Sequence, residues 1–256
     1  MLITDYETNG YVLLKNFFDS DEIKLWETGA SYLKEIPEII GGPMKYFEKS
    51  QINDEIILNR VEKFCDYLPL LNELVRGEKI GRLLKELTAR NYRLFKEKIN
   101  YNLSGGGGFR PHQDGAAFRK FVDDELITIM IPIHFSDEKN GCFKVSSQKY
   151  IKELLPHANG SIELNEYDIK NSMNWQDIKM KPGDLLCFSS YLVHQSKDNL
   201  SQLDRSCYFI TYSPNDFGDL RDAYFTFKRE KFPPRIERSS DQDYEQWRKT
   251  LSREIL

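Results

Sequence analysis

The sequence predicts a mainly β domain with flanking helices. Three observations carry this prediction: a short polar strand at residues 109–115, an apolar run of strand length that ends at His194, and a further strand at 207–212. Glycine, proline, asparagine or aspartate punctuates these runs, which is typical of strands joined by tight turns. The helices are expected in the stretches before residue 92.

The polar strand carries His112 and Asp114, two residues apart. Successive side chains of an extended strand point to opposite faces, so both can reach one ion while Gln113 points away. His194, at the far end of the apolar run, supplies a third ligand from another direction. Two imidazoles and one carboxylate are the ligand set of a mononuclear non-haem iron(II) oxygenase.

Arg205 precedes the strand at 207–212. A buried arginine is costly unless a carboxylate pairs with it, and its planar fork suits the distal carboxylate of a 2-oxo dicarboxylic acid. Two ligand strands and an arginine strand around a metal predict a double-stranded β-helix, the cupin-like jelly roll. His134 and His157 lie outside this arrangement and are expected to be surface or hydrogen-bonded polar residues.

The segments before the core are predicted from capping and periodicity. Asp19 or Ser20 is a suitable N-cap, and Leu83, Leu84 and Leu87 recur at helical spacing. The predicted elements are a strand within residues 6–17, a helix over 20–32, a short strand at 45–48, and a helical region that begins at 59–64 and continues over 68–75 and 80–88.

Residues 92–101 predict a strand with two different faces. One face carries Phe95, Glu97, Ile99 and Tyr101, the other Lys96, Lys98 and Asn100. The sequence leaves open which face lines the pocket. Candidates for contact with a substrate are Lys98, Asn100, Tyr101 and Ala117, and paired surface polar residues are the alternative for the first two.

The remaining stretches are assigned more simply. Glycines 105–108 lack the context of a phosphate loop and predict a hairpin or a close backbone approach. The further expectations are a buried strand at 126–133, a turn at 139–143, an irregular loop at 151–177, a cationic flap at 217–234 and a surface helix at 241–256. Residues 1–256 are predicted to form one domain, with N-terminal elements at 1–91, the jelly-roll core at 92–215, and the flap and last helix at 216–256.

Composition narrows the class of protein. The chain has 256 residues and a net charge of −4, without the basic stripe that nucleic acid would require. Its four cysteines lack close paired spacing, which favours reduced thiols. There is no signal segment and no apolar run of membrane-spanning length. We therefore expect a cytoplasmic monomer or homodimer that acts on a small molecule.

His112-Gln-Asp114, His194-x-Ser196 and Arg205 resemble the motif set of the phytanoyl-CoA dioxygenase family of iron(II)- and 2-oxoglutarate-dependent oxygenases. The resemblance runs from about residue 59 to 238. Residues 94–101, 105–108 and 111–114, together with Tyr212 and 221–238, are most similar to the 2-aminoethylphosphonate dioxygenase-like branch. Where the family usually has Pro-Gly-Ser-His, this chain has Ser-Ser-Gln-Lys at 146–149.

The resemblance implies iron(II) on His112, Asp114 and His194, with dioxygen and 2-oxoglutarate as co-substrates. It further implies contacts to 2-oxoglutarate from a set of residues on several strands: Arg205, Ser196, Thr128, Met130 and Arg60. Hydroxylation is expected, since members that halogenate replace the carboxylate ligand with a small residue. The substrate is predicted to be small and anionic or zwitterionic, with an amino-alkylphosphonate as a candidate. The alternatives are a natural-product intermediate, a metal-dependent cupin without 2-oxoglutarate, or an inactive scaffold.

Overall fold

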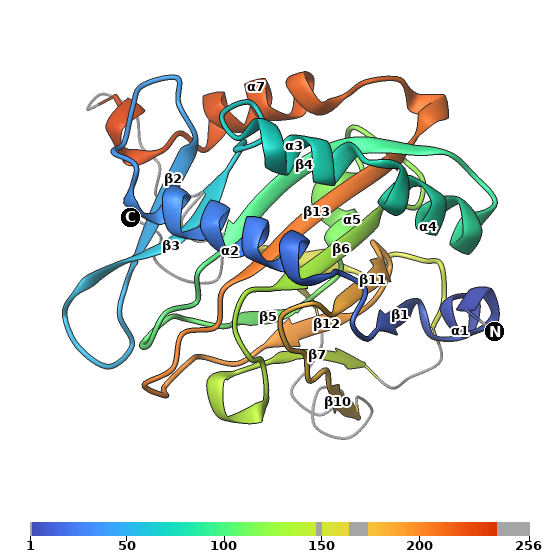
Figure 1. The fold of residues 1–256 in the computed structure, drawn as a ribbon, viewed down its shortest axis with the longest axis horizontal. Coiled ribbons are helices and arrows are strands. Elements are labelled where there is room, and N and C mark those ends of the chain that lie inside the picture. Colours follow the sequence, from blue (N-terminus) through green and yellow to red (C-terminus); the bar gives the residue numbers. More distant parts are fainter. Residues whose placement is uncertain (1, 147–149, 164–173, 240–256) are drawn as a thin grey trace.

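Two antiparallel sheets lie face to face in the computed structural model, which describes residues 2–146, 150–163 and 174–239 (Figure 1). The larger sheet has the order β1 (Tyr11–Leu14), β11 (Leu185–Ser189), β6 (Ile127–Pro132), β13 (Cys207–Pro214), β4 (Tyr92–Asn100), β3 (Ile56–Glu62) and β2 (Met44–Lys49). The smaller sheet has the order β10 (Trp175–Asp177), β7 (Phe143–Ser146), β12 (His194–Ser196) and β5 (Phe109–His112). A separate hairpin pairs β8 (His157–Ala158) with β9 (Ser161–Ile162). The predicted jelly roll with flanking helices is confirmed.

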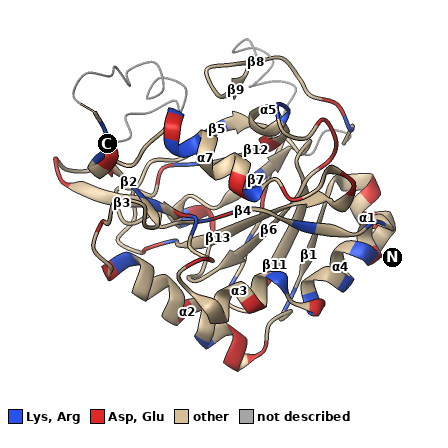
Figure 2. Cartoon of the chain, turned by 90° about the horizontal axis from the view of Figure 1, so that it is seen from above, with Lys and Arg blue, Asp and Glu red and all other residues tan. Residues whose placement is uncertain are grey.

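The helices that precede residue 92 cover the outer face of the larger sheet, and the smaller sheet lies on its other side (Figure 2). Helix α2 begins as predicted, because the Asp19 side chain accepts from the backbone of Glu22 and the Glu22 side chain accepts from the backbone of Asp19. The helices are α1 (Leu2–Asn9), α2 (Ser20–Glu35), α3 (Pro69–Arg76), α4 (Glu78–Thr88), α5 (Asp114–Phe118) and α7 (Arg221–Lys231). Three 3₁₀ turns occupy Glu138–Asn140, Asn215–Phe217 and Arg235–Glu237.

Three apolar clusters hold these layers together. The first lies under the helices, where Trp26 and Leu84 pack towards Tyr208. The second fills the space between the sheets and contains Met130, Phe143, Val145, Leu186 and Phe188. The third joins α7 and α5 to the larger sheet through Tyr224, Phe225, Phe95, Phe118 and Met44. The predicted flap at 217–234 is therefore packed on the core along α7.

The prediction of helix at 59–64 is wrong, because residues 59–62 belong to strand β3 and the next two residues are not helical. Arg60 and Glu62 face inward beside Asn100 and Lys98 of β4, and Val61 packs under the helices on the other face. Because the inward-facing side chains are charged, the sequence lacks the alternation of apolar and polar residues that is typical of a strand. Contacts with the neighbouring strands stabilise the extended backbone instead. The N-terminal strand is also shorter than the predicted range, since α1 occupies residues 2–9.

The predicted division of the two faces of strand β4 is wrong for Phe95. Glu97, Ile99 and Tyr101 point towards the helices, whereas Phe95 joins the opposite side with Lys96. The cause is a register shift against β13, where Thr211 pairs with Lys96 but the next residue pairs with Leu94. An extra residue in one strand reverses the facing of everything beyond it.

The glycines at 105–108 provide close backbone approach, as predicted. A Cβ on Gly108 would stand 2.3 Å from the Ser196 carbonyl oxygen, so only glycine lets this loop pass beside β12. All four cysteines are buried and free. No helix in the described part of the chain is both long and apolar enough to cross a membrane. The predicted helix at 241–256 and the last three residues of the Ser-Ser-Gln-Lys segment, 147–149, lie outside the described residues.

Candidate active site

His112, Asp114 and His194 converge where the smaller sheet meets α5. Strand β5 ends at His112 and pairs with β12, so that His112 lies opposite His194. Gln113 continues the extended backbone, and Asp114 begins α5 rather than extending the strand. Asp114 Oδ1 lies 3.7 Å from His112 Nε2 and 3.9 Å from His194 Nε2. One ligand atom from each residue falls within 4.8 Å of the others.

Both imidazoles are oriented by their second nitrogen. Nδ1 of His112 lies 2.7 Å from the Arg110 carbonyl, and Nδ1 of His194 lies 2.9 Å from the Leu192 carbonyl. A carbonyl can only accept a hydrogen bond, so the proton belongs on Nδ1 and the lone pair on Nε2. Both lone pairs are thus available to an ion beside Asp114.

The carboxylate ligand is held in the same way. Thr128 Oγ1 donates to Asp114 Oδ2 across 3.4 Å and lies 3.0 Å from Thr211 Oγ1. His194 stacks on Phe143 with ring centroids 4.8 Å apart. Hydrogen bonds and packing behind metal ligands fix their direction before an ion arrives.

The protonation states fit a cation. Burial and the neighbouring His194 lower the pKa of His112 to about 3, and burial lowers that of His194. Burial alone raises the pKa of Asp114, but His194, Lys96 and His112 hold it at about 2. Two neutral imidazoles and one ionised carboxylate are the forms that bind a metal, and this donor set suits iron(II).

A cavity opens from the three ligands towards β4 and β13. Its lining residues besides the ligands are Lys98, Asn100, Asn102, Phe109, Phe143, Gln195, Ser196, Arg205 and Phe209. Arg205 is 4% exposed, and its Nε donates to the Asn140 carbonyl across 3.1 Å. The sequence-predicted Arg205, Ser196, Lys98 and Asn100 are therefore brought together with the predicted ligands.

Four cations lie close to one another on the inner face of β3 and β4 and on α7. We call Arg60, Lys96, Lys98 and Lys228 the cationic cluster. Glu62 is its one internal carboxylate within the described residues: Arg60 Nε lies 2.8 Å from Oε1, and Lys228 Nζ lies 2.7 and 2.6 Å from the two oxygens. Although burial alone raises the pKa of Glu62, Lys228 and Arg60 lower it to about 2.

Lys96 and Lys98 are the unpaired members of this cluster. No carboxylate within the ranges 2–146, 150–163 and 174–239 comes within 4.0 Å of either ammonium group. Lys96 Nζ instead lies 4.5 Å from the Phe118 ring centroid, and Lys98 Nζ lies 5.2 Å from that of Phe209. Burial lowers the pKa of both, and that of Lys98 falls well below its usual range.

Other predicted site residues lie elsewhere. Tyr101 is on the helix-covered face, where its hydroxyl donates to Ala30 O across 2.7 Å, and Ala117 is exposed on α5. Met130 packs between the sheets, and Thr128 supports Asp114 from behind. Arg60 belongs to the cationic cluster, next to the cavity-lining Asn100. Sequence reasoning missed Glu62, whose alternation with Arg60 along one strand face was the available signal.

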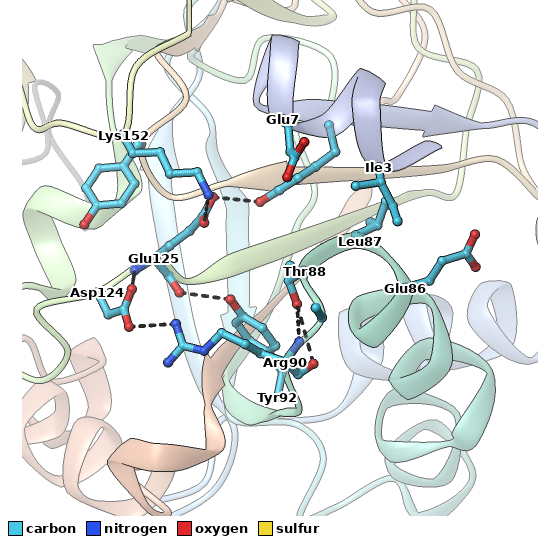
Figure 3. A pocket seen from close by; sticks show the side chains of 13 residues that line it. Ile3, Glu7, Glu86, Leu87, Thr88, Arg90, Tyr92, Asp124, Glu125 and Lys152 are labelled. Atoms are coloured by element: carbon cyan, nitrogen blue, oxygen red, sulfur yellow. Dashed lines mark hydrogen bonds and ion pairs between the residues drawn. The ribbon is translucent and has the colours of Figure 1, made fainter. Parts of the chain in front are cut away.

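A second pocket lies between α1, α4 and the segment before β6 (Figure 3). Both cations of its lining are paired with carboxylates: Lys152 with Glu125 at 2.8 Å, and Arg90 with Asp124 at 2.8 Å. Its two cations are thus already neutralised, and the three metal-ligating side chains line the other cavity.

The fold and the site together define a non-haem iron- and 2-oxoglutarate-dependent dioxygenase. The family model described as phytanoyl-CoA dioxygenase (PhyH) matches residues 6–207. The chain belongs to that family.

Two curated relatives and one solved structure illustrate the similarity. A 2-aminoethylphosphonate dioxygenase from Uncultured bacterium HF130_AEPn_1 is 38% identical over 94% of this chain and 91% of its own length. A methylphosphonate hydroxylase from Gimesia maris is 31% identical over 89% of this chain and 85% of its own length. The crystal structure of EctD from S. alaskensis with 2-oxoglutarate and 5-hydroxyectoine superposes with a TM-score of 0.65 at 16% identity, covering 84% of this chain and 75% of that one.

Proposed function

We propose that this enzyme hydroxylates a small anionic or zwitterionic substrate, with an amino-alkylphosphonate as the first candidate. His112, Asp114 and His194 hold iron(II), and Arg205 with Ser196 anchors 2-oxoglutarate. When bound, iron with 2-oxoglutarate and dioxygen supplies the oxidising power for hydroxylation, with release of succinate and CO2. The protein's own residues bind and orient the two organic molecules.

The assignment of Arg205 to 2-oxoglutarate rests on an unmatched charge. Arg205 is buried at the cavity wall, and no carboxylate of the described residues pairs with it. A buried cation without a counter-ion is costly, and a dicarboxylic acid supplies that counter-ion. The Ser196 hydroxyl accepts from the Phe109 amide at 3.1 Å, so its own proton is available to the same carboxylate.

The two unpaired lysines are the observation that carries the substrate class. Lys98 lines the cavity, and Lys96 precedes it on the same face of β4. Neither ammonium group forms an ion pair with a carboxylate of the described residues, so an anion with more than one negative oxygen would supply the close counter-charge that the buried Lys96 and the half-buried Lys98 lack. A large uncharged natural-product intermediate would leave both unmatched.

Asn100 adds a reason to favour a zwitterion. Its side-chain oxygen is buried at the cavity and lacks a hydrogen-bond partner within the described structure. An orphaned acceptor is costly and is satisfied by a donor such as a substrate ammonium group. The named activities of the two curated relatives, on 2-aminoethylphosphonate and methylphosphonate, support the same class of substrate.

A panel of small acids tests the proposal. Succinate release from 2-oxoglutarate is measured with 2-aminoethylphosphonate, methylphosphonate, the carboxylate 3-aminopropanoate and an uncharged alcohol, with phosphorus NMR for the products. We expect stimulation by the phosphonates, strongest for the amino compound, and a new hydroxylated product. Stimulation by the alcohol alone, or by no anion in enzyme that binds iron and 2-oxoglutarate, would overturn the substrate assignment.

A further inference from the structure

The side chain of Gln113, between two of the metal ligands, points away from the cavity into residues 150–157, which we call the strap. Its Nε2 donates to the Glu153 carbonyl at 2.9 Å and to the Tyr191 carbonyl at 2.7 Å, and its Oε1 accepts from the Leu155 amide at 2.8 Å. Its backbone amide donates to His157 Nε2 at 3.2 Å. At 2% exposed, Gln113 uses both amide hydrogens and its oxygen.

The strap has a second anchor at Glu125. Lys152 Nζ donates to Glu125 Oε2 across 2.8 Å (Figure 3), and the Tyr150 hydroxyl lies 3.0 Å from Glu125 Oε1 and 2.6 Å from Ser189 Oγ. The Tyr150 ring also covers Gly10, where a Cβ would meet it at 2.4 Å. The strap is therefore tied down at its beginning, independently of Gln113.

The strap also packs against Gly115 of α5, on the other side of Asp114. A Cβ on Gly115 would stand 3.1 Å from Leu154 Cδ2 and 3.2 Å from the Ser190 carbonyl, to which the Gly115 amide donates at 2.9 Å. The strap thus contacts the residues on both sides of the carboxylate ligand. A shift of the strap must move Gln113 or Gly115, and with them the backbone that aims His112 and Asp114.

We propose that Gln113 is a positioning residue that couples the strap to the metal ligands, so that metal affinity depends on a seated strap. This inference rests on the proposed metal site. Coupling of this kind is reciprocal, because a metal that binds better with the strap seated must also stabilise the seated strap. Partners behind metal ligands are worth about 10–100-fold in metal affinity.

The test measures metal affinity and strap order separately. Iron(II) and cobalt(II) are titrated anaerobically into the apoprotein of wild type, Gln113→Leu, His157→Ala, Asp114→Ala and the control Gln176→Leu. Gln176 is an exposed glutamine of β10 that accepts one hydrogen bond from Tyr11, so it receives the same exchange away from the site. Hydrogen exchange of the peptide that contains the strap is followed with and without metal.

We expect Gln113→Leu to weaken metal binding by about 10–100-fold, His157→Ala to weaken it less, and Gln176→Leu to leave it unchanged. In wild type, metal should slow hydrogen exchange in the strap several-fold, and this effect should vanish in Gln113→Leu. The inference would be overturned if a folded Gln113→Leu protein bound metal as tightly as wild type. It would also be overturned if metal did not change the rate of hydrogen exchange in the wild-type strap. Undiminished affinity in Asp114→Ala would instead overturn the proposed metal site.

Discussion

Replacing Lys98 by methionine is expected to stabilise the protein while weakening the binding of an anionic substrate. Methionine keeps the length and apolar stem of the side chain but removes its charge. Lys98 lies at the cavity, among the rings of Phe109 and Phe209, with burial and Lys96 both opposing its charge.

The two effects have opposite signs and separate sizes. Replacing a buried ion pair by apolar groups often stabilises a protein by about 1–4 kcal/mol, and removing the half-buried, unpaired charge of Lys98 should act in the same direction. Each kcal/mol raises Tm by about 2–4 °C for a chain of this length. Losing one partner of a buried charge pair costs about 2–5 kcal/mol of binding, and every 1.4 kcal/mol is about tenfold. KM for the phosphonate should therefore rise at least about 30-fold.

The pH dependence gives an independent check on the stability term. Because the folded pKa of Lys98 is lowered below its unfolded value, the unfolded state binds more protons between the two pKa values, and wild-type stability rises with pH there. The gain from Lys98→Met should be largest at low pH and shrink as pH approaches the unfolded pKa of about 10.4. Thermal unfolding and steady-state kinetics are measured beside Lys85→Met, an exposed control on α4. A lower Tm with unchanged KM would refute the reasoning.

Three further substitutions separate structural from substrate-binding roles. Glu62→Gln should lower stability at pH 7 by about 3–5 kcal/mol, since it leaves Arg60 and Lys228 without their buried partner. Because the pKa of Glu62 is about 2 in the folded protein, its ionised form adds to the free energy of unfolding above its unfolded pKa, and this contribution is lost as pH falls towards 2. The free energy of unfolding, measured with urea, should therefore fall less steeply with decreasing pH in the variant than in wild type. An equal pH dependence in the two proteins would contradict this. Tyr101→Phe should cost about 0.5–1.5 kcal/mol through the loss of its buried hydrogen bond to the Ala30 carbonyl and should leave KM unchanged. A raised KM would indicate that Tyr101 contacts the substrate. Asn100→Ala should raise KM for 2-aminoethylphosphonate more than for methylphosphonate, and equal changes would remove its proposed contact to the ammonium group.

The sequence predicted the centre of the site because its chemistry leaves local signals. His112 and Asp114 are two residues apart, and His194 ends a strand that a Pro-Gly-Asp turn introduces. These spacings follow from the two-residue period of extended backbone and from turn geometry, so they can be recognised without knowledge of the tertiary structure. Arg205 was predictable because an arginine entering a buried strand requires an anion.

What the sequence did not predict depends on contacts between distant segments. β3 was mistaken for a helix because Arg60 and Glu62, which alternate on its inner face, are charged. The face of Phe95 is decided by an irregularity in the pairing with β13, which no property of residues 92–101 encodes. Tyr101 lies on the face opposite Lys98, as the alternation predicts, but only the packing of the helices shows which of these faces lines the cavity. The match of Lys228 with Glu62 joins residues 166 apart in the chain.

The most direct test of the account is an anaerobic titration of iron(II)-loaded protein with 2-oxoglutarate, followed through the weak visible absorption that iron(II) and 2-oxoglutarate give when bound together. We predict saturable absorption in wild type and in Arg82→Ala, a control at an exposed arginine of α4. Arg205→Ala should require far more 2-oxoglutarate or show no band. A band of equal strength and affinity in Arg205→Ala would contradict the anchoring role of Arg205. No band in wild type with iron demonstrably bound would contradict the proposed binding of 2-oxoglutarate at this site.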